Sequence, residues 1–124
     1  MHEATAPAEL LTWLAAEISG VEALLQGSGP TCQLDRQHAS PPSLKALEGR
    51  YFVLRRATRL LETGQPLQAL ATEADKARAV LAADAGLARQ AAWVAYSQAV
   101  LDAVQALQER AGAAWAGGAD RSDR

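Results

Sequence analysis

The chain has 124 residues, enough to bury one continuous hydrophobic core without disulfides or bound metal. Its formal net charge of −2 points to neither a nucleic-acid partner nor a membrane surface, and its single cysteine, Cys32, excludes an internal disulfide. Ala and Leu, which fit readily into helices, dominate the composition, and no alternating run of β-branched residues predicts a strand. We therefore expect one all-α domain, residues 1–115, followed by a disordered tail, residues 116–124.

The expected location is the cytoplasm. The N-terminus lacks the basic and apolar regions of a signal peptide, and one cysteine fits a reducing compartment. The most apolar window, Leu87 to Leu107, contains Arg89, Asp102 and several glutamines, so it is a poor candidate for a transmembrane helix. We expect no membrane contact.

The first predicted helix runs from about Pro7 to Gln26, because proline suits the first helical turn and Gly27 ends the helix. Apolar residues recur along it at alternating steps of three and four, which is typical of a helix face turned toward a core. These residues are Leu11, Leu14, Ile18, Val21 and Leu25.

A long connection, residues 27–42, follows this helix. Connections of this length are uncommon in compact domains unless they are functional or disordered. Extended, it would reach roughly 50 Å, whereas a helix of about twenty residues is only about 30 Å long. The favoured interpretation is a disordered segment, or a crossover that runs back along the bundle and leaves the first two helices parallel. A functional loop is the alternative.

The second and third predicted helices form a tight antiparallel hairpin. The second runs from about Pro42 or Ser43 to Thr63, and the third from Pro66 to about Ala83. Gly64 just past a helix, with proline two residues later, is a strong stop-and-turn signal. The residues expected to face the core are Leu44, Leu47, Tyr51, Leu54, Thr58 and Leu61 in the second helix, and Leu67, Leu70, Ala74, Ala77 and Leu81 in the third.

The fourth predicted helix runs from about Ala85 to Trp115, with Asp84 as its N-cap. Large apolar residues start a new register at Leu87, which favours a break after the third helix. The expected fold is thus a four-helix bundle. If the third and fourth helices were continuous, three long helices would result instead.

The fourth helix is apolar on almost every side, which is typical of a helix that is buried on most sides. In a four-helix monomer each helix normally keeps one solvated face, so the extra apolar surface favours a homodimer or a different protein partner. The alternative is that this helix is the central element of a monomer. The expected interface residues are Trp93, Ala95, Tyr96, Ala99, Val100 and Leu107.

Charge is divided between the first two helices. The first helix and the residues before it carry acidic but no basic side chains, whereas residues 35–59 carry an excess of Lys and Arg. These basic side chains would suit phosphate groups or an acidic partner. The favoured interpretation is that the basic second helix packs beside the acidic first helix or is merely solvated. The residues concerned are Arg50, Arg55, Arg56 and Arg59.

No pattern in the sequence predicts catalysis, a metal centre or a cofactor. Cys32 and His38 are too few for a structural zinc site, and no Glu-x-x-His pair predicts a di-iron bundle. His38 lies in a predicted loop, whereas phosphorelay domains carry their histidine in the middle of a helix. We therefore expect a non-enzymatic protein that needs no cofactor.

The stretch Leu60–Leu70, followed by Lys76, resembles the hairpin of coiled-coil export chaperones of the flagellar FlgN type. The resemblance implies a chaperone that binds a helix of its partner. From the residues alone, the expected function is protein–protein interaction or assembly, with dimerisation through the fourth helix. The alternatives are a nucleic-acid-associated protein that uses the basic second helix, and an export or assembly chaperone.

Overall fold

The computed structural model describes residues 6–27, 42–83 and 91–116. Every regular element in these ranges is helical, which confirms the predicted all-α class. The α-helices are α1 (Pro7–Gly27), α3 (Pro42–Glu62), α4 (Ala71–Ala82) and α6 (Ala91–Ala111), and the short 3₁₀ helices are η1 (Leu67–Leu70) and η2 (Gly112–Ala116). None of these helices is long and apolar enough to cross a membrane.

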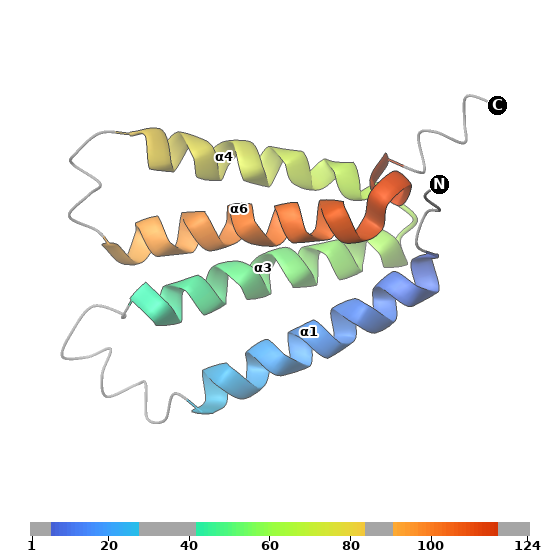
Figure 1. Ribbon diagram of the computed structural model, residues 1–124, viewed down its shortest axis with the longest axis horizontal. Helices are drawn as coiled ribbons and strands as arrows, with labels where there is room; N and C mark the ends of the chain where they lie inside the picture. Colours follow the sequence, from blue (N-terminus) through green and yellow to red (C-terminus); the bar gives the residue numbers. More distant parts are fainter. Residues whose placement is uncertain (1–5, 28–41, 84–90, 117–124) are drawn as a thin grey trace.

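The α-helices lie side by side in the order α1, α3, α6, α4 (Figure 1). The two central helices, α3 and α6, pack most extensively on each other, while α1 packs on α3 and α4 packs on α6. α1 and α4 run in one direction, and α3 and α6 run in the other (Figure 1). The result is a helical bundle in which α6 is flanked by two other helices of the same chain.

α1 and α3 are antiparallel neighbours, so the predicted crossover with two parallel helices is wrong (Figure 1). Polar contacts hold this pairing, since Arg50 forms an ion pair with Glu17 and the Tyr51 hydroxyl donates to Glu22 Oε2 at 3.0 Å. The acidic side of α1 thus meets the basic side of α3, as the favoured interpretation of the charges predicted. The connection itself, residues 28–41, lies outside the described residues.

The chain reverses after α3 at the predicted place. Gly64 has a φ of 74°, in the left-handed region that favours glycine. Its N–H bonds to the Leu61 carbonyl at 3.2 Å and the Gln65 N–H bonds to the Leu60 carbonyl at 2.8 Å, which is the Schellman arrangement. η1 then directs α4 over α6, so α3 and α4 run antiparallel as predicted but spread apart from the turn instead of packing tightly on each other (Figure 1).

α4 and α6 are separate helices, so the alternative of three long helices is wrong. Ala83 is extended, with φ −65° and ψ 160°, and α6 returns antiparallel beside α4 (Figure 1). The predicted N-cap Asp84 and helix start Ala85 lie outside the described residues. At its other end α6 stops at Ala111, before the predicted end at Trp115, because Gly112 adopts a φ of 55° and leads into η2.

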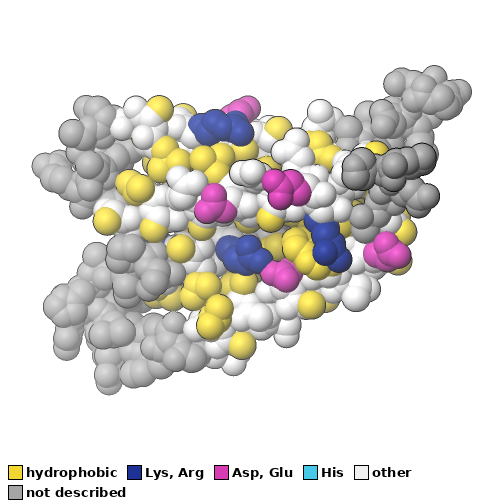
Figure 2. Space-filling model, viewed as in Figure 1, with side chains coloured by type: hydrophobic (Ala, Val, Ile, Leu, Met, Phe, Trp, Pro, Cys, Tyr) yellow, Lys and Arg dark blue, Asp and Glu magenta, His cyan; other side chains and the backbone are white. Residues whose placement is uncertain are grey.

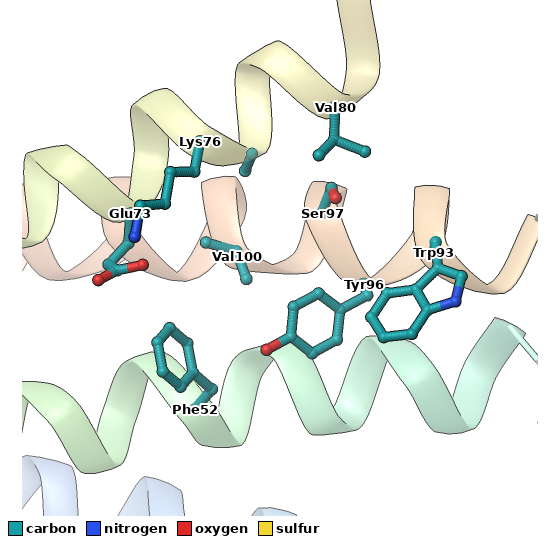
Figure 3. Close-up of a pocket in the computed structure, with 9 residues that line it drawn as sticks. Phe52, Glu73, Lys76, Val80, Trp93, Tyr96, Ser97 and Val100 are labelled. Atoms are coloured by element: carbon teal, nitrogen blue, oxygen red, sulfur yellow. The ribbon is translucent and has the colours of Figure 1, made fainter. Parts of the chain in front are cut away.

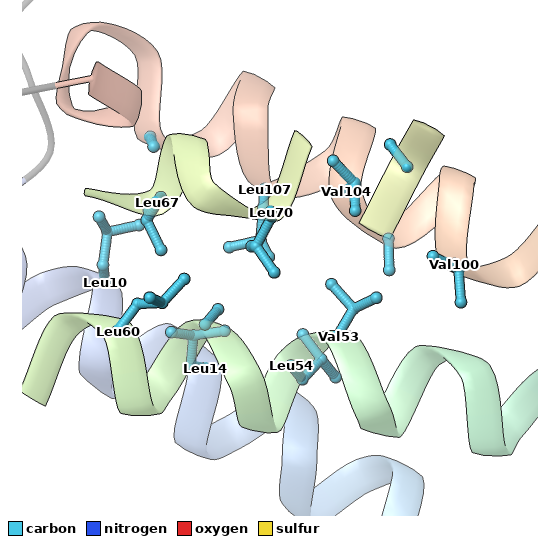
Figure 4. Packing of buried hydrophobic residues seen from close by; sticks show 14 of the residues in the cluster. Leu10, Leu14, Val53, Leu54, Leu60, Leu67, Leu70, Val100, Val104 and Leu107 are labelled. Atoms are coloured by element: carbon cyan, nitrogen blue, oxygen red, sulfur yellow. The ribbon is translucent and has the colours of Figure 1, made fainter. Parts of the chain in front are cut away.

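One hydrophobic cluster joins all of these helices (Figure 4). Burying one leucine side chain stabilises a fold by roughly 1.5–3 kcal/mol, so this cluster dominates the favourable energy. The largest fully buried side chains are Leu10, Leu14, Val53, Leu54, Leu67, Leu70 and Leu107. Most are residues that the apolar periodicity predicted, although Leu10 rather than Leu11 is buried in α1.

α3 buries two faces where the sequence predicted one. Val53, Ala57 and Leu60 are buried in addition to Leu54, whereas Tyr51 of the predicted face is only half-buried beside α1. The reason is that α3 lies between α1 and α6. A helix with two neighbours needs two apolar faces, and a single pattern of threes and fours identifies one of them.

Gly49 lets α3 and α6 approach closely. A Cβ atom at this position would lie 2.6 Å from the Tyr96 carbonyl oxygen and 3.3 Å from the Ala99 Cβ. Ala99 is one of the residues expected at an interface with a second copy or another protein. Within the chain, it lies where α6 meets α3.

Candidate functional site

An open groove of about 420 Å³ lies where α3 and α4 spread apart over α6. Figure 3 shows the side chains that all three helices direct into it. On both α4 and α6 the lining residues recur at steps of three, one and three, which places them along a single strip of each helix. This aromatic groove is lined by Phe52, Glu73, Lys76, Ala77, Val80, Trp93, Tyr96, Ser97 and Val100.

Large aromatic side chains border the aromatic groove while keeping contact with solvent. Trp93 is 44% exposed and Phe52 is 37% exposed. The Trp93 and Tyr96 rings meet edge to face, with centroids 5.4 Å apart and planes at 62°. The Lys45 ammonium lies 4.4 Å from the centroid of the Trp93 ring, a cation–π contact that helps to hold the indole in place. The aromatic surface is therefore preformed.

The polar groups of the aromatic groove are few. Glu73 forms an ion pair with Arg56 at 3.5 Å, and the Ser97 side chain lies at the base, in a residue only 5% exposed. Burial raises the pKa of the Tyr96 hydroxyl above its usual value of 10.0, so this tyrosine is neutral near pH 7. Such a lining is suited to bind apolar surface, because it offers few groups that need water.

A second groove, between α4 and α6, is lined mainly by polar side chains. It measures about 460 Å³ and is lined by α4 and α6 residues that the aromatic groove does not use. Its polar side chains bond to one another: Gln98 donates to Asp102 at 3.0 Å, and Gln105 donates to Glu109 at 3.2 Å. This polar groove is lined by Ala74, Arg78, Gln98, Leu101, Asp102, Val104, Gln105, Gln108 and Glu109.

No family model, curated protein or solved structure matches this chain. The geometry of the two grooves therefore has to supply the functional argument. Between them, the aromatic groove is the stronger candidate, since removing apolar and aromatic surface from water is the dominant favourable term in association.

The structure divides the six interface residues that were expected on the fourth helix. Trp93, Tyr96 and Val100 come together in the aromatic groove, with Val100 at its base and only 3% exposed. Leu107 is fully buried in the core. The small residues Ala95 and Ala99 are half-buried, and Ala99 faces Gly49 of α3.

Sequence reasoning missed the contributions of α3 and α4 to the aromatic groove. Phe52 is the one phenylalanine of the chain, and it lies off the predicted core face of α3, which is a signal for an exposed aromatic residue. Val80 and Lys76 lie off the core face of α4 in the same way. Val80 and Lys76 come close to Trp93 because η1 directs α4 over α6.

The four arginines of α3 do not all lie together. Arg50 pairs with Glu17, and Arg56 pairs with Glu73. Arg55 lies over the Tyr51 ring at 5.9 Å, and Arg59 is exposed. Three of the arginines, Arg55, Arg56 and Arg59, line a hollow of about 550 Å³ next to the aromatic groove, together with two glutamates. On the face shown in Figure 2, acidic and basic side chains are interspersed.

Among the described residues, no group of three or more His, Cys, Asp or Glu side chains lies close enough to hold a metal ion. Cys32 and His38, which the sequence analysis considered for a zinc site and a phosphorelay site and set aside, lie outside the described residues.

Proposed function

We propose that this protein works by binding another polypeptide in the aromatic groove. The observation that supports this most strongly is the combination of partly exposed Phe52 on α3 and Trp93 on the neighbouring α6 in one open apolar groove. Aromatic side chains, tryptophan above all, are enriched among the residues that contribute most to the binding energy of protein–protein interfaces. The helices of the chain act as the scaffold that holds them.

The depth of the aromatic groove also favours this proposal. Val100 and Ala77 form its base, and both are nearly fully buried. An apolar side chain that enters the groove would contact α3, α4 and α6 at once, so most of its surface would leave water. Of the three remaining predicted interface residues, Ala99 and Leu107 pack within the chain, and Ala95 is half-buried outside the groove lining.

Site-specific photocrosslinking tests the proposal. A photoreactive benzoyl group placed at Phe52 should give a covalent adduct with the partner in an extract of the native cells. The same group at Gln105, in the polar groove of the same bundle, is the matched control and should give none. The absence of any adduct specific to position 52 would contradict the proposal.

The mass of the adduct identifies the class of partner. An adduct of twice the chain mass of 13.1 kDa indicates the homodimer that the sequence predicted, and any other mass indicates a different protein. The chaperone alternative is one form of this proposal, because such a chaperone would hold a partner helix in an apolar groove. The cytoplasmic location stays a prediction.

A further inference from the structure

We infer that the occupant of the aromatic groove is an acidic amphipathic α-helix of a partner protein. This inference rests on the proposed function and specifies the chemistry of the partner. It follows from three properties of the groove: its length, the backbone of its walls, and the charges along its edges.

The length of the aromatic groove fits a short helical segment. Its lining spans Glu73 to Val80 on α4 and Trp93 to Val100 on α6, eight residues and seven helical steps in each case. At 1.5 Å per step, the α4 side and the α6 base of the groove are each about 10 Å long, or two helical turns. A docking helix would therefore place two or three apolar side chains, spaced three, four or seven residues apart, into the groove.

The walls favour a helix over an extended peptide. α3, α4 and α6 use their own backbone N–H and C=O groups within their helices, so the groove offers no strand edge to an incoming chain. An extended peptide against these apolar walls would leave part of its backbone without hydrogen-bond partners, which is costly. A helix satisfies its own backbone and presents only side chains.

The charges along the edges favour acidic residues on the partner. Glu73, the acidic residue in the lining, already pairs with Arg56. Lys76 lines the α4 side, is exposed, and forms no ion pair with any described residue. On the α3 side, the exposed Arg55 and Arg59 line the adjoining hollow together with two glutamates, one of which already pairs with a lysine. On both edges of the apolar strip, the side chains outside ion pairs therefore carry more positive than negative charge.

A display library of helical peptides tests this inference on the full chain. Peptides would be selected on the wild-type protein, with both the apolar positions and the flanking positions randomised. We expect apolar residues at helical spacing, flanked by Asp or Glu. For a selected peptide, replacing the Glu facing Lys76 by Gln should weaken binding about threefold at low salt, an effect that high salt removes.

Charge reversal supplies the decisive comparison. Selection on Lys76→Glu should shift the flanking preference from acidic to basic residues. Arg78→Glu is the matched control, because Arg78 lies on the same helix but lines the polar groove. The inference would be overturned if peptides that bind in the groove showed no preference for charged flanking residues, or the same preference on wild type and Lys76→Glu. The proposed function would still stand in that case.

Other outcomes separate the remaining alternatives. If no peptide is enriched, or if enrichment persists on Trp93→Ala, the proposed function itself fails. A DNA duplex provides the last test. If it competes with the acidic peptide, and if the double variant Arg55→Ala with Arg59→Ala no longer binds it, the basic edge binds nucleic acid and the inference of an acidic helix is overturned.

Discussion

The two grooves beside α4 and α6 are nearly equal in volume, at about 420 Å³ and about 460 Å³, yet one is lined by aromatic and apolar side chains and the other mainly by polar ones. In the polar groove, glutamines and carboxylates on α6 bond to one another one helical turn apart. In the aromatic groove, Trp93 and Tyr96 also project from α6, but their rings contact each other edge to face, and Lys45 lies over the Trp93 ring. The volume of a groove alone therefore does not identify a binding site.

The two grooves differ in the free energy that is gained when a partner displaces water from their lining. The polar side chains already have hydrogen bonds and solvent, so displacing water from them gains little. The aromatic rings in the other groove lose unfavourable contact with water when another surface covers them. The same bundle thus carries one surface that is stable when exposed and one that gains from a partner.

The largest expected effect is on the binding of an apolar probe. Phe52→Ala with Trp93→Ala should weaken binding of the dye anilinonaphthalene sulfonate about tenfold or more, which corresponds to about 1.4 kcal/mol. Fluorescence titration measures this. The paired control in the polar groove, Gln98→Ala with Gln105→Ala, should leave the dye affinity unchanged. Equal losses in both variants would remove the distinction between the grooves.

A change at Gly49 tests whether the close approach of α3 and α6 supports the aromatic groove. Gly49→Ala places a Cβ atom 2.6 Å from a backbone oxygen of α6, so the helices must move apart, and the free energy of unfolding should fall by about 1–2 kcal/mol. Gly20→Ala is the control, because nothing lies within 4 Å of a Cβ there. It should stabilise α1 by up to about 1 kcal/mol.

Urea unfolding, followed by circular dichroism, measures both glycine variants. A stabilised Gly49→Ala protein would show that the helices are not in tight contact. Dye binding by the same variant then reports whether the separation of the helices also changes the aromatic groove.

Making the polar groove apolar should create a second, weaker site. Asp102→Leu with Gln105→Leu removes one member of each hydrogen-bonded pair and leaves apolar surface in a hollow of similar volume. The dye should then bind with a stoichiometry of about two instead of one, and the variant should self-associate more strongly. Unchanged stoichiometry would mean that the depth or the rigid aromatic rings, rather than polarity, distinguish the two grooves.

The smallest expected effect concerns the ionisation of Tyr96. Burial raises the pKa of this tyrosine above 10.0, so its neutral form stabilises the fold below that pH, and this contribution is lost as the pH rises through the raised pKa. The chain has two tyrosines, so Tyr51→Phe leaves Tyr96 as the one that titrates. Trp93→Ala should then lower its pKa toward the usual value, and Gln105→Ala should not. Tyrosinate absorbance follows both.

Local signals in the sequence predicted most of the fold. Gly64 and Pro66 located the turn after α3, and the apolar periodicity located Leu14, Leu54 and Leu70 in the core. These features depend on neighbours within a few residues. The pairing order of the helices depends on the whole bundle, which is why the direction of α1 relative to α3 was not predictable from the length of the connection.

The candidate site was only partly predictable for the same reason. Trp93, Tyr96 and Val100 lie on one helix at helical spacing, so their common face could be predicted. Phe52 joins them because α3 packs directly on α6, and Lys76 joins them because α4 lies over α6 instead of along α3. The excess of apolar residues on α6 reflects its two neighbours within the chain as well as the aromatic groove.

The most direct test of the central claim follows the three tryptophans during dye titration. Trp13 stacks with Arg110, Trp115 packs against the core, and Trp93 lies in the aromatic groove. Their indole N–H signals, assigned by single Trp→Phe variants, are separately observable by NMR. We predict that the Trp93 signal shifts and saturates while the other two stay in place. A shift of Trp13 or Trp115 equal to that of Trp93, or no saturable shift of Trp93, would contradict the account.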